Sequence, residues 1–267
     1  LWNIGAEGQL YLGALAAVVV GGGMIDAPAL VLAPLVMLAG AVAGALGMLG
    51  PAWLKTRLGV DEVVTTLLSN FVILLFVQMM LEGPLQDPMG MGWPQSAPVV
   101  PAAELPPLVE RMRVHAGLLV GLAAAVIAAV AIARTTWGLR VRAVGENPAA
   151  ARHAGIPVGR TLLGVAIVSG GLAGLAGAGE IAGLKGYLTA DLSPGFGYAG
   201  IVVAMLAGLS PLGVVAAALF IAAVFVGADS MSRALGVSSY LADLVVALAL
   251  LCVLVGGFVA RYRIVRR

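Results

Sequence analysis

Long runs of apolar residues, separated by short polar segments, make up most of the chain. These runs predict membrane helices at about residues 8–22, 28–49, 62–81, 116–133, 161–182, 198–209, 212–228 and 240–259. A helix rises about 1.5 Å per residue, so about 20 apolar residues cross a bilayer. The run at 198–209 is too short to cross alone, and we expect a half-helix or an extension by its neighbours. The pattern predicts an all-α polytopic membrane protein with about eight transmembrane segments.

Composition supports a membrane location. The chain is 61% hydrophobic and 10% charged, whereas soluble domains are about 25% charged. Its 37 glycines predict helices packed through small residues, as at Gly40-x-x-x-Gly44 and Gly170-x-x-x-Gly174. The single cysteine, Cys252, excludes an intrachain disulfide. Residues 1–267 read as one transmembrane domain, and we expect further sequence upstream because the chain starts within a motif.

Basic residues indicate the orientation in the membrane. Most of the 15 Lys and Arg residues lie in the segments 50–61, 134–160 and 260–267, which fall on one side in this topology. Because cytoplasmic loops are enriched in Lys and Arg, this side is predicted to be cytoplasmic, with the C-terminus inside.

The longest connection on the opposite side, 82–115, contains repeated prolines and therefore cannot be one continuous helix. We expect an extracytoplasmic loop with a short surface helix near Leu105–Arg113. Two roles remain open for it, a plain linker or a docking surface for an external partner.

A polar motif opens the chain. Glu7 lies at the mouth of an apolar run, where a carboxylate is costly. The flanking Gly5 and Gly8 predict that the backbone leaves helical geometry there, as in a broken helix beside a solute path. Glu7 either lines that path or is a structural carboxylate satisfied by free amides, and Asn3 and Gln9 share its role.

Further polar side chains lie within the apolar runs. Thr66, Ser69 and Asn70 share one helix face because they are three and four residues apart. Their amide and hydroxyl groups would suit a sugar or a nucleoside, although hydrogen bonding between helices is an equal alternative. Phe196 and Tyr198 follow a chain break at 191–195, where they either stack on a ligand or anchor at the interface.

The basic segment 134–160 contains a patterned stretch. Asn147 can cap a helix, Pro148 suits its first position, and Gly155 followed by Pro157 ends it. These signals predict a two-turn helix at Pro148–Ala154. The helix either docks into a groove of a cytoplasmic partner or is a solvated turn.

A weak internal repeat is also present. Gly59–Val64 and Gly236–Leu241 each lead into an apolar run, and Gly8–Gly13 is similar to Gly197–Gly200. Corresponding members start from opposite sides of the membrane, which is typical of inverted repeats in transporters.

Three motifs in this order resemble one family. Asn3–Gln9, Gly59–Leu67 with Asn70, and Gly145–Gly155 are similar to the permease subunit of ABC importers for simple sugars and nucleosides. That family is related to the ribose and branched-chain amino acid permeases, and the form of Asn3–Gln9 resembles its nucleoside branch. The likeness extends over nearly the whole chain, but Ser69 replaces an expected bulkier apolar residue and leaves the substrate preference open.

The resemblance implies an architecture and a set of partners. Family members have about ten membrane segments, with two expected before Leu1. The coupling helix seated in the ATPase would comprise Gly145, Glu146, Asn147, Pro148, Ala150, Ala151 and Gly155. The implied partners are a cytoplasmic ATP-binding-cassette ATPase, a second permease subunit, and an extracytoplasmic lipoprotein or periplasmic binding protein, in a bacterial cell membrane and without nucleic acid.

Missing motifs limit the chemistry. The chain has no Gly-x-x-x-x-Gly-Lys-Ser/Thr phosphate loop, and neither His115 nor His153 has companions at metal-ligand spacing. We therefore expect a transporter subunit rather than an enzyme, without a cofactor or metal. The alternatives are an ion-coupled secondary transporter that uses Glu7, Glu180 or Asp243, and a membrane scaffold that transports nothing.

Overall fold

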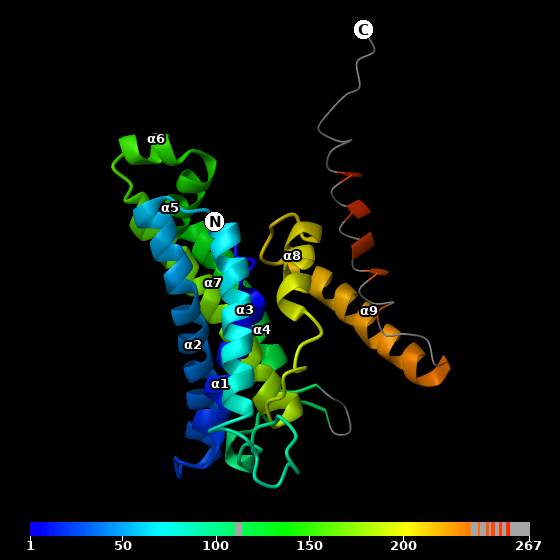
Figure 1. Ribbon diagram of the computed structural model, residues 1–267. Coiled ribbons are helices and arrows are strands. Elements are labelled where there is room, and N and C mark those ends of the chain that lie inside the picture. Colours follow the sequence, from blue (N-terminus) through cyan, green and yellow to red (C-terminus); the bar gives the residue numbers. More distant parts are fainter. Residues whose placement is uncertain are drawn as a thin grey trace. The chain divides into compact units, whose positions relative to one another are not determined.

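The structure is a computed structural model that describes residues 1–109, 114–235, 240, 244–245, 247–248, 251–252 and 255–256. Its helices are α1 (Ala6–Gly21), α2 (Ala29–Leu58), α3 (Glu62–Leu81), α4 (Gly117–Arg134), α5 (Thr136–Glu146), α6 (Pro148–His153), α7 (Val158–Glu180), α8 (Phe196–Leu206) and α9 (Gly213–Leu235). A 3-10 turn at Pro101–Ala103 and a π-helical turn at Ile181–Lys185 are also present among the described residues. The α-helices are labelled in Figure 1.

The predicted all-α class is confirmed. Among the described residues, α2, α3, α4, α9 and α7 with its π-helical turn are long and apolar enough to cross a membrane, whereas α1 and α8 are shorter apolar helices. Seven predicted runs coincide with helices, and the eighth, 240–259, lies largely outside the described residues. The count of eight spans and the inverted repeats stay predictions, because one repeat member, Gly236–Leu241, also lies largely outside them.

The chain divides into two compact units. The first comprises residues 1–124 and 130–197, and the second comprises residues 125–129 and 198–267. The main core of the first unit contains side chains from α1, α2 and α7, among them Leu10, Val36 and Ala178. In the second unit, Val202 and Val203 of α8 cluster with Ile221 of α9.

Glycines bring the backbones of α1, α2 and α7 into direct contact. A Cβ on Gly44 of α2 would lie 2.6 Å from the Gly174 Cα of α7, and a Cβ on Gly13 of α1 would overlap the Gly174 carbonyl. Gly170 contacts the same part of α2, since a Cβ added to Gly170 would lie 2.7 Å from Met48 Cβ. The two predicted Gly-x-x-x-Gly motifs therefore face each other across one helix interface.

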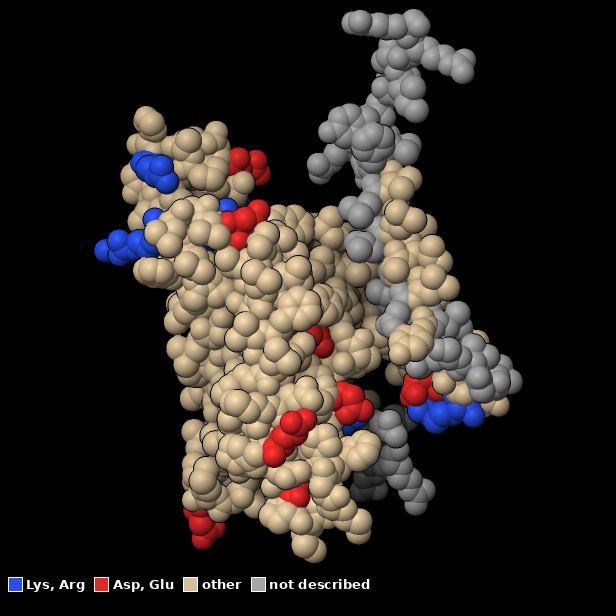
Figure 2. Space-filling model, in the orientation of Figure 1, with Lys and Arg blue, Asp and Glu red and all other residues tan. Residues whose placement is uncertain are grey.

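Basic residues are concentrated at one end of the first unit. Most of the blue surface visible on this unit lies around α5 and α6, whereas red atoms predominate toward the other end (Figure 2).

Lys55 and Glu62 form a 2.6 Å ion pair between the end of α2 and the start of α3. The predicted loop at 50–61 is largely wrong, because α2 continues through Pro51 to Leu58 and is followed by Gly59 as its C-cap, with φ of 70°.

The proline-rich connection, 82–115, packs against the chain that follows α7. Ser96 pairs with Leu188 through its backbone, and its hydroxyl accepts a 2.9 Å bond from the Leu188 N–H. The Leu105 N–H also donates to the Ala182 carbonyl. The expected surface helix is wrong for Leu105–Val109, which are not helical, because two successive prolines remove backbone donors and restrict the preceding residue; residues 110–113 lie outside the described residues.

His115 predicts a pH-dependent contact at this connection. Its ring lies over Gly183, and its Nδ1 accepts a 3.2 Å bond from the Gly117 N–H, so the ring is neutral at that nitrogen. Burial lowers the pKa of His115 below its ordinary value of about 6.5. His115 therefore binds a proton more readily when the connection is detached or unfolded than when it is packed. The packed connection loses stability as the pH falls below about 6.5.

We expect faster amide hydrogen exchange in residues 82–109 at pH 5.5 than at pH 7.5, after correction for intrinsic rates. The non-titrating variant His115→Asn should remove most of this difference. A pH dependence that persists in His115→Asn would contradict the assignment to this side chain.

Candidate functional site

The polar motif at the start of the chain lies at the N-terminus of α1. Residues 1–4 are not helical, and the helix begins at Ala6 after Gly5. Gly8 is inside the helix, so the expected loss of helical geometry is confirmed only before Ala6. Gly8 instead permits close contact, since a Cβ there would lie 2.9 Å from Asn70 Oδ1.

Asn70 of α3 caps the start of α1 from across the interface. Its Oδ1 accepts a 2.8 Å hydrogen bond from the Gly8 N–H, and its Nδ2 donates a 2.8 Å bond to the Ile4 carbonyl. Gly5, the N-cap residue, has no side chain with which to cap the helix. Asn70 therefore supplies the acceptor that a capping side chain would normally provide to the first turn.

Thr66 lies one turn before Asn70 and has a related role. Its hydroxyl accepts a 3.3 Å bond from the Ile4 N–H and donates a 2.7 Å bond to the Glu62 carbonyl. Thr66 and Asn70 are both fully buried. Both side chains therefore hold the backbone of the opening segment in this structure.

Asn3 connects α1 and α7 through its amide. Its Nδ2 donates to Gln9 Oε1 at 2.7 Å and to Ser169 Oγ of α7 at 2.9 Å. Its Oδ1 accepts from the Gly5 N–H and from Gln9 Nε2, both at 3.0 Å. Gln9 Nε2 also contacts Met48 Sδ of α2 at 3.3 Å.

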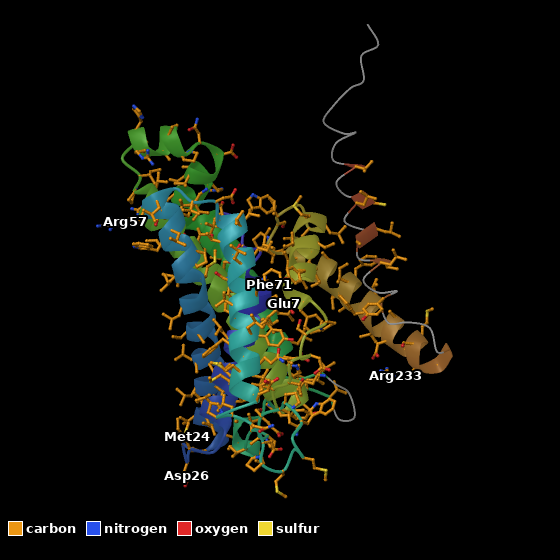
Figure 3. All side chains as sticks on the ribbon, in the orientation of Figure 1. Glu7, Met24, Asp26, Arg57, Phe71 and Arg233 are labelled. Carbon is orange, nitrogen blue, oxygen red and sulfur yellow. The ribbon has the colours of Figure 1, made fainter. Side chains whose placement is uncertain are left out.

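Glu7 is buried beside the start of α8. Its Oε2 accepts a 2.6 Å bond from the Gly197 N–H, and a Cβ on Gly197 would overlap the Glu7 backbone. A carboxylate is favourable at a helix N-terminus, where backbone amides lack intrahelical partners. Within the first unit, Glu7 lies between the levels of Arg57 and Asp26, which mark opposite ends (Figure 3).

The segment before α8 is held by two hydroxyl groups. Ser193 Oγ accepts bonds from the N–H groups of Gly195 and Phe196, at 3.1 and 2.9 Å. The Tyr11 hydroxyl donates to the Ala190 carbonyl at 2.8 Å and accepts from the Ser193 N–H at 3.2 Å. Phe196 itself is 38% exposed.

The structure brings together five of the eight predicted path residues, Asn3, Glu7, Gln9, Thr66 and Asn70, around the first turns of α1. Ser69 is only partly buried, and its hydroxyl donates to the Thr65 carbonyl of its own helix. Tyr198, in α8 of the second unit, is 40% exposed.

Sequence reasoning missed Tyr11, Ser169 and Ser193. Ser169 had a usable signal, as a polar residue beside the first glycine of a Gly-x-x-x-Gly motif.

The basic segment 134–160 contains two helices where one was predicted. Thr135 caps α5, since its Oγ1 accepts a 3.0 Å bond from the Gly138 N–H. A Thr cap directly after an apolar run is a start signal that could have predicted α5. The helix predicted at Pro148–Ala154 is confirmed as α6, which ends one residue earlier, at His153.

The predicted caps of α6 are present. Asn147 Oδ1 accepts 3.0 Å bonds from the N–H groups of Ala149 and Ala150. Gly155 follows the helix in the left-handed region with φ of 79°, a conformation that favours glycine.

One face of α6 is anchored, and the other is open. Ala151 is buried in a small cluster with Val144 and Val158, against which Ile156 packs. The remaining residues predicted for ATPase coupling are exposed, namely Gly145, Glu146, Asn147, Pro148, Ala150 and Gly155. Small exposed side chains on a fixed helix leave room for a partner surface to approach closely.

Comparison with known proteins identifies the family. The family model described as branched-chain amino acid transport system / permease component matches residues 1–254. The chain is 41% identical to the glucose ABC transporter permease protein TsgB13 of Haloferax volcanii, over 99% of this chain and 72% of the relative. It is 36% identical to the guanosine ABC transporter permease protein NupP of Bacillus subtilis, over 95% of this chain and 73% of the relative.

A third relative, the nucleoside ABC transporter permease protein NupB of Lactococcus lactis, is 32% identical over 87% of this chain. No solved structure matches the chain. These relatives are permease subunits, and ATP hydrolysis in such transporters belongs to a separate subunit. The chain therefore belongs to the branched-chain amino acid transport system / permease component family, as a multi-pass permease subunit of an ABC importer of the simple sugar and nucleoside type.

Proposed function

We propose that this permease moves a nucleoside or a simple sugar across the cell membrane, driven by an ATPase that grips α6. One observation carries the proposal. In a permease that has no ATPase of its own, α6 is exposed, capped at both ends and anchored to the start of α7 through Ala151.

The choice of substrate class rests on the relatives and on side-chain chemistry. The matched relatives carry names for glucose, guanosine and nucleoside transport. The amides and hydroxyls around the start of α1 can bond to sugar hydroxyls or base nitrogens without imposing a fixed charge. We propose that the substrate path passes the start of α1. The candidate residues for lining this path are Asn3, Glu7, Gln9, Thr66, Ser69, Asn70, Phe196 and Tyr198.

The proposed assembly contains two permeases and an external binding protein. Each ATPase of a pair needs its own contact, so a second permease would line the same path. We place the end of the first unit that carries Arg57 and α6 in the cytoplasm, together with the C-terminus, because Lys and Arg are retained there. The connection 82–115 then faces a lipoprotein or periplasmic binding protein.

Uptake measurements test this proposal. Cells that carry the complete importer should take up labelled guanosine or glucose, and uptake should cease when the partner ATPase is inactivated. Continued uptake without the ATPase would reject the proposal. The ion-coupled alternative, which the relatives do not favour, predicts instead that an uncoupler abolishes uptake whether or not the ATPase is active.

Removal of the α6 cap should weaken ATPase binding. Asn147→Ala deletes the acceptor for two N–H groups at the start of α6, a loss of about 1 kcal/mol of helix stability. We expect less ATPase to copurify with this variant, and Asn147→Ser, which retains a capping oxygen, should restore binding. The matched control is Asp61→Ala, which removes the cap of α3 without touching α6; unchanged copurification in Asn147→Ala would argue against α6 as the contact.

A further inference from the structure

Ser169 makes a contact that sequence reasoning missed. It lies in α7, about three helical turns beyond Val158. Its hydroxyl oxygen accepts a 2.9 Å hydrogen bond from Asn3 Nδ2. This bond joins α7 to the polar segment Asn3–Gln9 at the start of α1. This contact connects two parts of the chain that are 166 residues apart.

The Asn3 side chain also bonds to other residues of the polar segment. The same Nδ2 that bonds Ser169 donates to Gln9, and the Asn3 Oδ1 accepts from Gly5 and Gln9. A displacement of Ser169 relative to α1 would therefore break or bend bonds that orient Asn3 and Gln9.

The start of α7 is attached to α6. The Ile156 N–H donates a 3.0 Å bond to the Ala151 carbonyl, and Ala151 packs against Val158, the first residue of α7. From Val158 to Glu180 the helix is uninterrupted. A force applied to α6 is therefore applied to the start of the helix that carries Ser169.

Close packing between α1 and α7 would not by itself define the position of Asn3 relative to α7. Farther along α7, Gly174 contacts Gly13, and Gly177 contacts Leu10, through close backbone approach. Such contacts hold the helices together but have little directional preference, whereas a hydrogen bond requires a specific distance and angle. The Ser169–Asn3 bond therefore adds a directional contact between the polar segment and α7.

We propose that Ser169 is a positioning residue for transport, which ties the polar segment Asn3–Gln9 to α7 so that movement of α6 reaches that segment. The inference rests on the proposed function, in which an ATPase grips α6. It assigns Ser169 no contact with the substrate.

The test uses the complete importer in proteoliposomes, with both permeases, the ATPase and the binding protein. Substrate uptake and ATP hydrolysis are measured together, and copurification reports ATPase association. In Ser169→Ala we expect uptake per ATP hydrolysed to fall about fivefold, the factor that corresponds to one lost hydrogen bond, with ATPase association unchanged. Ser169→Thr retains the hydroxyl and should restore the ratio, which a purely structural role would not require.

Two further variants make the result specific. Thr56→Ala removes a hydroxyl that bonds the Ala52 carbonyl within its own helix, and it should leave the ratio unchanged. Asn3→Ala should lower the ratio at least as much as Ser169→Ala, because it also removes the bonds to Gly5 and Gln9. The double variant should show no loss beyond that of Asn3→Ala, because the Ser169 bond is already absent there.

A normal ratio of uptake to ATP hydrolysis in Ser169→Ala, with normal ATPase association, would overturn this inference and leave the proposed function intact. Unchanged ATPase binding in Asn147→Ala would instead count against the proposed function. If Ser169→Ala does not accumulate in the membrane, Ser169→Cys preserves the size of the side chain with a much weaker hydrogen-bonding group. A wild-type ratio in Ser169→Cys would equally overturn the inference.

Discussion

Replacement of Gly44 by alanine should lower the melting temperature of the detergent-solubilised protein. The new Cβ would lie 2.6 Å from Gly174 Cα and 2.7 Å from Gly174 N, and these are backbone atoms that cannot rotate away. Forcing extra volume into a tightly packed contact costs about 1–3 kcal/mol. Gly44→Leu would separate α2 from α7, and we expect little folded protein in the membrane, as measured by fluorescence-detected size-exclusion chromatography.

Gly50 of the same helix provides the matched control. A Cβ on Gly50 would meet nothing within 4 Å. Because alanine has a higher helix propensity than glycine, Gly50→Ala should keep or slightly raise the melting temperature. Equal melting temperatures for Gly44→Ala and Gly50→Ala would mean that close approach of α2 and α7 does not stabilise the fold.

The second large effect is expected at Asn70. Asn70→Leu leaves the Gly8 N–H and the Ile4 carbonyl without the bonds that Asn70 supplies. Each buried polar group that loses its partner costs about 1–3 kcal/mol. We therefore expect a large loss of melting temperature and at least a tenfold loss of uptake, as the first turn of α1 frays.

Its neighbour Ser69 is the control for stability. The Ser69 hydroxyl bonds within its own helix, so Ser69→Ala should change the free energy of unfolding by less than about 0.5 kcal/mol. Asn70→Asp retains an acceptor for Gly8 but places carboxylate oxygen against the Ile4 carbonyl, so it should also be destabilised. If Asn70→Leu kept the wild-type melting temperature but lost uptake, Asn70 would act on the substrate directly rather than by capping α1.

These expectations differ in how far the sequence anticipates them. Helix α3 was predicted with its observed bounds, 62–81, and Asn147 was predicted as the cap of α6. Both follow from local rules, since an apolar run must satisfy its backbone in the membrane and a capping oxygen bonds amides two or three residues away. The resemblance of three motifs also identified the family, which the comparisons confirm.

Errors arose where the local sequence signals were misleading. The end of α2 was placed nine residues too early, because Pro51 and the charged residues after it are typical of a loop. A proline is nevertheless accommodated within this helix. Helix α5 was missed because its own sequence is much less apolar than a membrane run.

Apolar runs, caps and the distribution of basic residues thus specify a multi-pass helical membrane protein with a structured loop, because each of these signals acts over a few residues. Which polar groups meet was decided only by tertiary packing. Asn70 reaches Gly8 across 62 residues of sequence and Ser169 reaches Asn3 across 166. The first of these contacts needs glycine at position 8, where a Cβ would lie 2.9 Å from Asn70 Oδ1. No local pattern encodes such pairs, since they depend on the rotation and separation of whole helices.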